Sequence, residues 1–186
     1  MWSELELKRQ VIRWYFLCKE QVGLDLGELD EVEVSPRARN WLGRCVSRQR
    51  RDATDKHCRL QFAKALLYLP DEYIVNTIVH EICHMVEGSR NHDHLWKMAG
   101  EQVNTVFPFV MIEVYATPEE IHLFEKQLKP RKEYRVHCEG CGHVYKFHRK
   151  TRFVKAVLEN GGKGWHCSCG SNDFWCEECR EGDEEC

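Results

Sequence analysis

The sequence predicts an α+β fold made of a main domain and a small cysteine-rich appendage. Three observations lead to this prediction: a strongly periodic apolar stretch over residues 70–88, shorter alternating patterns over residues 31–69, and a group of cysteines after residue 137. At 186 residues the chain is long enough for one domain with a hydrophobic core and a further small unit. Its 42% hydrophobic and 31% charged residues are typical of a folded, water-soluble protein and unlike a disordered or collagen-like chain.

The first predicted element is a helix over residues 3–22. Its apolar side chains recur at helical spacing among charged residues, and Gly23 gives the stop. Between Glu31 and Leu69 the pattern shortens to an alternation that predicts two or three antiparallel strands. One candidate strand contains Trp41, Cys45 and Val46, and another contains Cys58, Leu60 and Phe62.

A second helix is predicted to begin at Pro70-Asp71-Glu72, since proline suits a first helical turn and acidic side chains complement the positive end of the helix dipole. Its apolar positions from Ile74 to Ile82 form one buried face, and Gly88 gives the stop. Two further helices are predicted over residues 93–106 and 118–128. The pair Lys129-Pro130 then closes the main domain.

The helix that begins at Pro70 carries the segment His80-Glu81-Ile82-Cys83-His84. Residues four apart lie on one face of a helix, so the two imidazoles can hold one zinc ion at about 2.0–2.1 Å. Glu81 can contact a zinc-bound water, whose pKa the metal lowers to about 7, and can accept its proton as hydroxide attacks a carbonyl. Two histidines and a glutamate on a buried helix face would be costly without a metal. The pattern therefore predicts a catalytic zinc site for amide hydrolysis.

The third ligand of this site comes from the segment that follows the helix. A catalytic zinc usually has three protein ligands and one open position for water. His92 and His94 are both candidates, because both follow a glycine-containing turn. Whichever of the two does not bind the metal is expected to be a surface histidine beside Asp93.

Three stretches of the chain resemble the SprT-like zinc metallopeptidases, the Spartan-like family. They are Leu66-Leu67-Tyr68-Leu69-Pro70, Ile78-Val79-His80-Glu81-Ile82-Cys83-His84-Met85 and Asn91-His92-Asp93-His94-Leu95-Trp96. In that family the third histidine is followed four positions later by Trp or Phe, and Trp96 stands four after His92, which favours His92 over His94. The family commonly has Gly directly after this histidine, where this chain has Asp93.

The resemblance implies a zincin-like domain, in which the ligand-bearing helix packs on a small antiparallel sheet. A related group, the Wss-type or WLM peptidases, shares a similar signature, and the helix alone does not separate the two. The resemblance extends over roughly residues 5 to 170, because SprT-like proteins often end in a zinc ribbon. The expected organisation is a metallopeptidase domain over residues 1–130, a zinc ribbon over 131–179 and an acidic tail over 180–186.

The predicted ribbon rests on closely spaced cysteines. Cys138-Glu-Gly-Cys141-Gly is a metal knuckle, in which glycine permits the turn that aims amide donors at sulfur. A second pair, Cys167 and Cys169, would complete a tetrahedral structural zinc site that stabilises a segment too small for its own core. Two alternatives remain open: Cys176 with Cys179 as the second pair, or His166 with Cys169. Four further cysteines are expected to be small core residues: Cys18, Cys45, Cys58 and Cys83.

Charge is distributed unevenly along the chain. Residues 129–163 contain ten Lys or Arg against three Glu, while the whole chain carries a net charge of -3, and residues 36–51 add six arginines and no acid. In the ribbon, aromatic and basic residues interleave from Tyr145 to Phe153, so bases could stack on rings while cations neutralise phosphates. An ordinary ribbon hairpin with a charged outer face is the competing interpretation. The pattern predicts contact with DNA, with a preference for single-stranded DNA left open.

The predicted function is zinc-dependent peptide hydrolysis, with Glu81 as general base and later as proton donor to the leaving amine. Two zinc ions are expected, one catalytic and one structural. Resemblance to the Spartan-like family implies substrates that are proteins associated with DNA or crosslinked to it. The alternative is a non-enzymatic DNA-binding or regulatory module with a purely structural zinc site, but such a site has no use for Glu81.

No segment of the sequence directs the chain to a membrane. The opening segment MWSELELKRQ is mixed in charge, and no apolar run approaches the roughly 18 residues that cross a bilayer. Eleven cysteines, with six clustered near the C-terminus, favour metal binding in a reducing compartment over a secreted disulfide framework. We therefore expect an intracellular protein without membrane contact, cytoplasmic or, in a eukaryote, nuclear. The sequence gives no indication of an oligomeric state.

Overall fold

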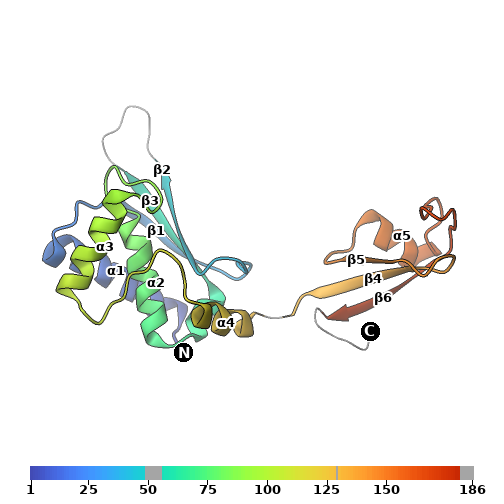
Figure 1. Cartoon of the computed structure of the whole chain (residues 1–186), viewed down its shortest axis with the longest axis horizontal. Coiled ribbons are helices and arrows are strands. Elements are labelled where there is room, and N and C mark those ends of the chain that lie inside the picture. Colours follow the sequence, from blue (N-terminus) through green and yellow to red (C-terminus); the bar gives the residue numbers. More distant parts are fainter. Residues whose placement is uncertain (49–55, 129, 181–186) are drawn as a thin grey trace. The chain divides into compact units, whose positions relative to one another are not determined.

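The structure is a computed structural model that describes residues 1–48, 56–128 and 130–180 (Figure 1). The chain divides into two compact units, Met1–Leu128 and Lys129–Cys186. Both contain helices and a small sheet, so the predicted α+β class is confirmed. In the described part of the chain, no helix has the length and apolar character to cross a membrane.

The helices of the first unit begin close to where the sequence predicts them. α1 (Glu4–Leu17) begins after Ser3, whose hydroxyl accepts a hydrogen bond from the Glu6 amide, and a π-helical turn (Cys18–Val22) carries it to Gly23 at φ 80°. α2 (Asp71–Cys83) follows a 3-10 turn (Lys64–Tyr68). α3 (His94–Val106) and α4 (Pro118–Gln127) begin after Asp93 and Thr117, which cap them in the same way as Ser3 caps α1.

α2 ends at Cys83, and the prediction that it continues to Gly88 is wrong. The chain turns sharply after His84, and the Lys56 ammonium donates hydrogen bonds to the carbonyls of His84, Val86 and Ser89 at 2.8, 3.0 and 3.2 Å. These carbonyls are therefore satisfied by a distant side chain instead of by the next helical turn. The helical period of the sequence does not contain that information.

The sheet of the first unit is mixed, so the predicted all-antiparallel sheet is wrong. Its strands are β1 (Glu28–Ser35), β2 (Gly43–Arg48) and β3 (His57–Ala63), in the order β1-β3-β2. β3 runs antiparallel to β2 and parallel to β1. The chain reverses direction between β1 and β2 and again between β2 and β3, which places β3 between them in the same direction as β1. An alternating hydrophobic pattern specifies the faces of a strand but not the direction of its neighbours.

The two faces of this sheet differ in polarity. On the outer face, Gln61 of β3 donates to Glu33 of β1 and accepts from Arg44 of β2, a polar ladder across all three strands. On the inner face, Leu60 and Phe62 are fully buried against the helices. This alternation is the one that the sequence predicts for the second candidate strand.

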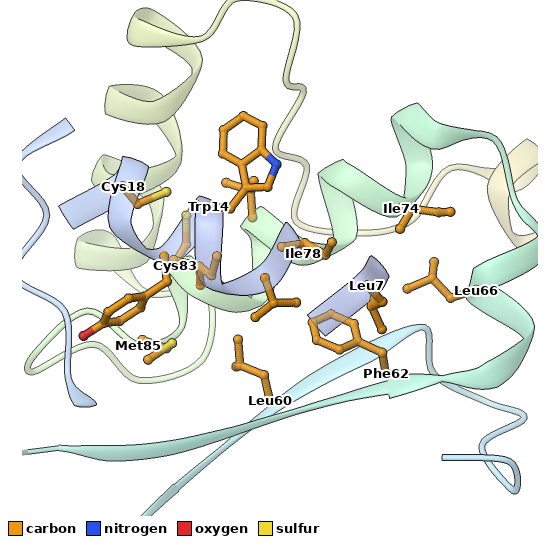
Figure 2. Packing of buried hydrophobic residues seen from close by; sticks show 14 of the residues in the cluster. Leu7, Trp14, Cys18, Leu60, Phe62, Leu66, Ile74, Ile78, Cys83 and Met85 are labelled. Atoms are coloured by element: carbon orange, nitrogen blue, oxygen red, sulfur yellow. The ribbon is translucent and has the colours of Figure 1, made fainter. Parts of the chain in front are cut away.

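The core lies between the sheet, α1 and α2 (Figure 2). Leu7 of α1 and Ile78 of α2 point toward Leu60 and Phe62 in this view, and all four are inaccessible to solvent. The expectation that four cysteines serve as core residues holds for Cys18, Cys58 and Cys83, which are buried, while Cys45 is half-buried. A well-packed core of this kind fixes α2, and with it every side chain that α2 carries.

The second unit is a three-stranded antiparallel sheet with one helix. Its strands are β4 (Lys132–Cys138), β5 (Val144–Phe147) and β6 (Phe174–Arg180), in the order β5-β4-β6. α5 (Arg152–Asn160) begins after the capping residue Thr151 and ends at Gly161 in the left-handed conformation. The sequence prediction contained no helix here, although the capping threonine and the buried Val154 and Val157 at helical spacing are its signals.

Candidate active site and cysteine centre

Three histidines of the first unit converge at the end of α2. The Nε2 atom of His80 lies 3.3 Å from Nε2 of His84 and 3.0 Å from Nε2 of His92. Two nitrogens bound to a tetrahedral zinc at about 2.0–2.1 Å would stand about 3.4 Å apart, so the donor set fits this metal. His94, the rival candidate, is exposed on the first turn of α3 and does not belong to the group.

Hydrogen bonds outside the triad aim its nitrogens inward. His80 Nδ1 donates to the carbonyl oxygen of Glu113 at 2.9 Å, which leaves the Nε2 lone pair free to face the other two rings. His84 hydrogen-bonds to the backbone of Asn91. Lone pairs that face one another repel, and a cation between them would convert this repulsion into attraction.

The position of His92 is set by the turn that leads into α3. Asn91 adopts the left-handed conformation at φ 51°, which asparagine tolerates better than most residues. Asp93 then caps α3 by accepting hydrogen bonds from the amides of Trp96 and Arg90 at 3.1 and 2.7 Å. The aspartate that follows His92, where SprT-like proteins commonly have glycine, is thus the residue that fixes the start of α3.

Trp96 packs against all three histidines of the triad. Its buried ring lies 4.8, 5.5 and 4.6 Å from the ring centroids of His80, His84 and His92. Burial lowers the pKa of His80 to about 4 and that of His84 to about 3. Both imidazoles are therefore neutral at pH 7, the state in which histidine binds metal.

Glu81 lies on the face of α2 that meets β2. Its carboxyl group is only 6% exposed, and burial raises its pKa to about 8, opposed by a hydrogen bond to the backbone of Cys45. Gly43 makes this approach possible: a Cβ atom there would stand 2.8 Å from Glu81 Cγ and 3.0 Å from Glu81 Oε1. A carboxyl group held beside the triad in a poorly solvated place is suited to proton transfer.

His80 and Glu81 line one cleft of about 790 Å³. Its walls are α2, the start of β2, the segment 107–117 and the first turn of α4. The segment 107–117 is held in place by side chains of two helices, because Met111 donates its amide to Asn76 Oδ1 and Ile112 to Asn104 Oδ1, at 3.1 and 3.2 Å. The cleft is open to solvent and large enough for an extended stretch of peptide.

Lys56 is a residue beside the candidate site that the sequence interpretation missed. It is 7% exposed, and its ammonium group holds the turn that connects the candidate ligands His84 and His92. Its own amide also donates to Glu87 Oε1 at 2.9 Å. A lone lysine before a strand gives no signal of this role, because the carbonyls that it contacts lie 28 to 33 residues later in the chain.

In the second unit, the structure brings together the four cysteines of the predicted ribbon. Cys138 Sγ lies 3.6 Å from Cys169 Sγ, and Cys141 Sγ lies 3.6 Å from Cys167 Sγ. Thiolates bound to a tetrahedral zinc at about 2.3 Å would stand about 3.8 Å apart, so this set also fits the metal. Gly140 permits the two knuckles to meet, since a Cβ atom there would stand 2.5 Å from the Cβ of Ser171.

Hydrogen bonds favour the thiolate form of Cys167 in this centre. Tyr145 Oη lies 3.2 Å from Cys167 Sγ. The backbone of Cys169 and this hydroxyl lower the pKa of Cys167 to about 5. The two alternative ligand sets are not assembled among the described residues, because His166 is exposed and Cys176 and Cys179 lie on β6, outside the group. Positions three apart on a strand point to opposite faces, so such a pair cannot share one ion without breaking the strand.

The interleaved aromatic and basic residues of the ribbon separate onto two faces. Tyr145, Phe147 and Phe153 pack together around the small core of this unit, with ring centroids about 6.0 Å apart. All three rings are partly buried, because β5 directs alternate side chains inward, and the stacking of bases on them stays a prediction. The basic side chains are exposed: Lys146, His148, Arg149, Lys150 and Arg152. Of the arginine-rich stretch 36–51, residues 49–51 lie outside the described part, as do residues 181–186 of the acidic tail.

A comparison with models of protein families finds a match for this chain. The sequence model of the SprT-like family matches residues 16–122, a range that contains α2, the turn and all three histidines. Searches of curated proteins and of solved structures returned no match.

Proposed function

Because the chain belongs to the SprT-like family, we propose that it is a zinc-dependent metallopeptidase that acts on proteins associated with DNA. The observation that carries the proposal is the convergence of three imidazoles, one of which, His80, lines an open cleft together with the buried Glu81. His80, His84 and His92 would hold the ion and leave one position toward the cleft. A zinc ion bound there would supply Lewis-acid polarisation of a carbonyl and a water of lowered pKa.

The chain's own residues would carry the proton transfers. Glu81 would take a proton from the attacking water and return it to the leaving amine, as its position beside His80 allows. The raised pKa of Glu81 is that of the metal-free site, and a nearby cation would lower it so that the carboxylate form prevails at neutral pH. The amide of Cys45 would keep the carboxyl group oriented through both steps.

The test of the peptidase proposal compares the zinc-loaded chain with Glu81→Gln on a loosely folded protein, with and without DNA. We expect Glu81→Gln to retain its zinc and to lose cleavage by at least about 100-fold, the contribution of a general base. Glu101→Gln, at an exposed position of α3 outside the cleft, is the matched control. Equal cleavage by the native chain and Glu81→Gln would leave a non-enzymatic zinc module as the better hypothesis.

DNA association is proposed on the exposed cations of the ribbon alone. Lys146, Arg149 and Arg152 are solvent-accessible, and a polyanion would release counterions on meeting them. Replacing Arg149 and Arg152 by Gln should reduce the slope of log K against log salt by about 2, because two phosphates would no longer be neutralised. The exposed pair Lys8 and Arg9 of α1 provides the control. Binding that does not change between low and high salt would refute the proposal.

A further inference from the structure

We infer that the cleft selects a lysine or arginine side chain of the substrate next to the scissile bond, with Glu120 as the residue that receives its cation. This inference rests on the proposed peptidase function and names the class of protein segment that the site would cleave. It comes from the distribution of charge in the cleft, the burial of Glu120 and the spacing along α2 between Glu81 and Thr77, the residue that contacts Glu120.

The cleft is strongly acidic. Besides Glu81, four carboxylates line it: Glu72, Glu113, Glu119 and Glu120. No lysine or arginine occurs among the described residues that line it. The phenol of Tyr73 is affected by this field, because burial and the neighbouring Glu119, Glu72 and Glu120 all raise its pKa. A cationic side chain would be attracted to such a place, and an acidic one would be repelled.

Glu120 is the innermost of these carboxylates. It is 8% exposed, and in the described parts of the chain no lysine, arginine or histidine forms an ion pair with it. Thr77 Oγ1 lies 3.4 Å away, but this hydroxyl is closer to the carbonyl of Tyr73, at 2.8 Å, and has one hydrogen to donate. Burying a carboxylate without a counter-charge is costly, and a substrate cation would offset that cost.

A role in capping accounts for part of the position of Glu120. Thr117 caps α4 by accepting from the Glu120 amide, and the Glu120 carboxyl group hydrogen-bonds to the Thr117 backbone, which is a capping box. A capping box explains why a glutamate or a glutamine stands here. It does not explain why a negative charge is buried in the wall of a peptidase cleft, since glutamine caps equally well and has no charge.

The spacing between Glu81 and Thr77, which contacts Glu120, suits a side chain adjacent to the scissile bond. Thr77, which contacts Glu120, lies one helical turn before Glu81, a rise of about 5.4–6 Å along α2. Thr77 and Glu81 both pack against Gly43, which confirms that they share one face of α2. A lysine or arginine side chain extends over a comparable length from its Cα atom.

Apolar groups line the same cleft as the two carboxyl groups. Leu42, Val114 and Ala116 belong to the cleft wall, and Phe109 and Met111 stand at its edge with 72% and 64% exposure. Lysine and arginine combine an aliphatic stem with a cationic head, so the stem can contact the apolar wall while the head meets Glu120. A glutamate or aspartate side chain would satisfy neither requirement.

The experiment uses the zinc-loaded full chain and matched peptides that differ only next to the cleaved bond, with lysine, arginine, norleucine or glutamate. We expect kcat/KM to be at least about tenfold higher for lysine or arginine than for norleucine, and lowest for glutamate. Glu120→Gln preserves the capping box and should bring the ratio of kcat/KM between the lysine and norleucine peptides down to about one. Glu125→Gln, an exposed position of the same helix outside the cleft, should keep the preference.

A binding measurement separates failure of this inference from failure of the peptidase proposal. The same peptides are titrated onto zinc-loaded Glu81→Gln and onto Glu81→Gln with Glu120→Gln. Tighter binding of the lysine peptide that depends on Glu120 supports the inference even if no peptide is cleaved. Cleavage or binding that is equal for lysine and norleucine peptides, or a preference that persists in Glu120→Gln, overturns it.

Discussion

The histidine centre and the cysteine centre are both candidate zinc sites, but they differ in the number and the placement of their donors. The histidines are three donors on one helix and the turn after it, and one of them, His80, lines a cleft of about 790 Å³. The cysteines are four donors on two short knuckles, which are positioned by backbone hydrogen bonds such as Gly142 N to Cys138 O and Gly170 N to Cys167 O. Four ligands close a tetrahedral site, whereas three leave a position for a reactant.

The two centres also differ in which residues hold their ligands in place. His80 and His84 depend on Glu113, Lys56 and Trp96, residues that lie outside α2 and that the tertiary fold brings to it. The cysteine knuckles depend on turns within a few residues of each ligand. We therefore expect the histidine centre to be sensitive to distant substitutions while its unit stays folded, and the cysteine centre to fail together with the fold of its unit.

The largest effect on folding is expected for Cys141→Ser, and His84→Ala is the variant to compare it with. Each should lower the zinc content by one ion per chain. Cys141→Ser should also unfold the second unit, because its core consists of seven buried residues and cannot stabilise it without metal. His84→Ala should leave the first unit folded on its own hydrophobic core. Zinc analysis measures the metal content, and limited proteolysis measures which unit is folded. A protease-resistant ribbon in Cys141→Ser would contradict the prediction.

The next effect is the acid sensitivity of the metal-free first unit. The folded-state pKa values of His80 and His84, about 4 and about 3, lie below the ordinary value of 6.5. Their contribution to stability is therefore complete above pH 6.5 and is lost as the pH falls toward these values, because the unfolded chain binds protons first. Urea unfolding of the chelated chain should show a decrease between pH 7 and 4 on the order of 3 kcal/mol for each of the two histidines.

Replacing both of these histidines by asparagine should flatten this pH profile. The control is His122→Asn, at an exposed position of α4, which should leave the acid-induced loss in place. An unchanged profile in the double variant would show that other groups cause the loss.

A smaller effect is expected for Lys56→Met, which preserves the aliphatic stem and removes the ammonium group. Three carbonyls of the turn after α2 lose the ammonium donor, although the Val86 carbonyl keeps another donor, the Ser89 amide; this should lower the free energy of unfolding by about 1–3 kcal/mol. The zinc affinity of the histidine centre should fall together with the free energy of unfolding, while the ribbon should keep its zinc. Lys64→Met, at an exposed position with a surface ion pair to Glu4, is the control and should have little effect.

The smallest effect is expected for Tyr145→Phe in the cysteine centre. Removal of the hydroxyl beside Cys167 Sγ should raise the pKa of this thiol, so zinc release on acidification should begin at a slightly higher pH. The ribbon should stay folded, since the ring and its packing against Phe153 remain. A metal-release curve followed with a chromophoric chelator tests this, and a shift to lower pH would be the opposite of the expectation.

Local patterns in the sequence predicted the helices of the first unit and the residues that its metal centre brings together. Spacing of four along a periodic helix placed His80 and His84 on one face, and two short glycine-containing turns placed the cysteine pairs. The parallel pairing of β1 with β3 could not be predicted, because a period of two does not encode strand direction. α5 was missed although its cap and apolar spacing are present, since a helix of 9 residues offers few turns over which a helical period repeats.

The sequence by itself determined which side chains can bind a metal, because ligand type and spacing along a helix or a knuckle are local properties. Only the tertiary structure decided that α2 ends at Cys83 under the control of Lys56, that Glu81 is buried against Gly43, and that Glu120 joins the cleft from 39 residues away along the chain. Burial, hydrogen bonding and the electrostatic field of a cleft depend on which distant segments pack together, and no local pattern contains that information.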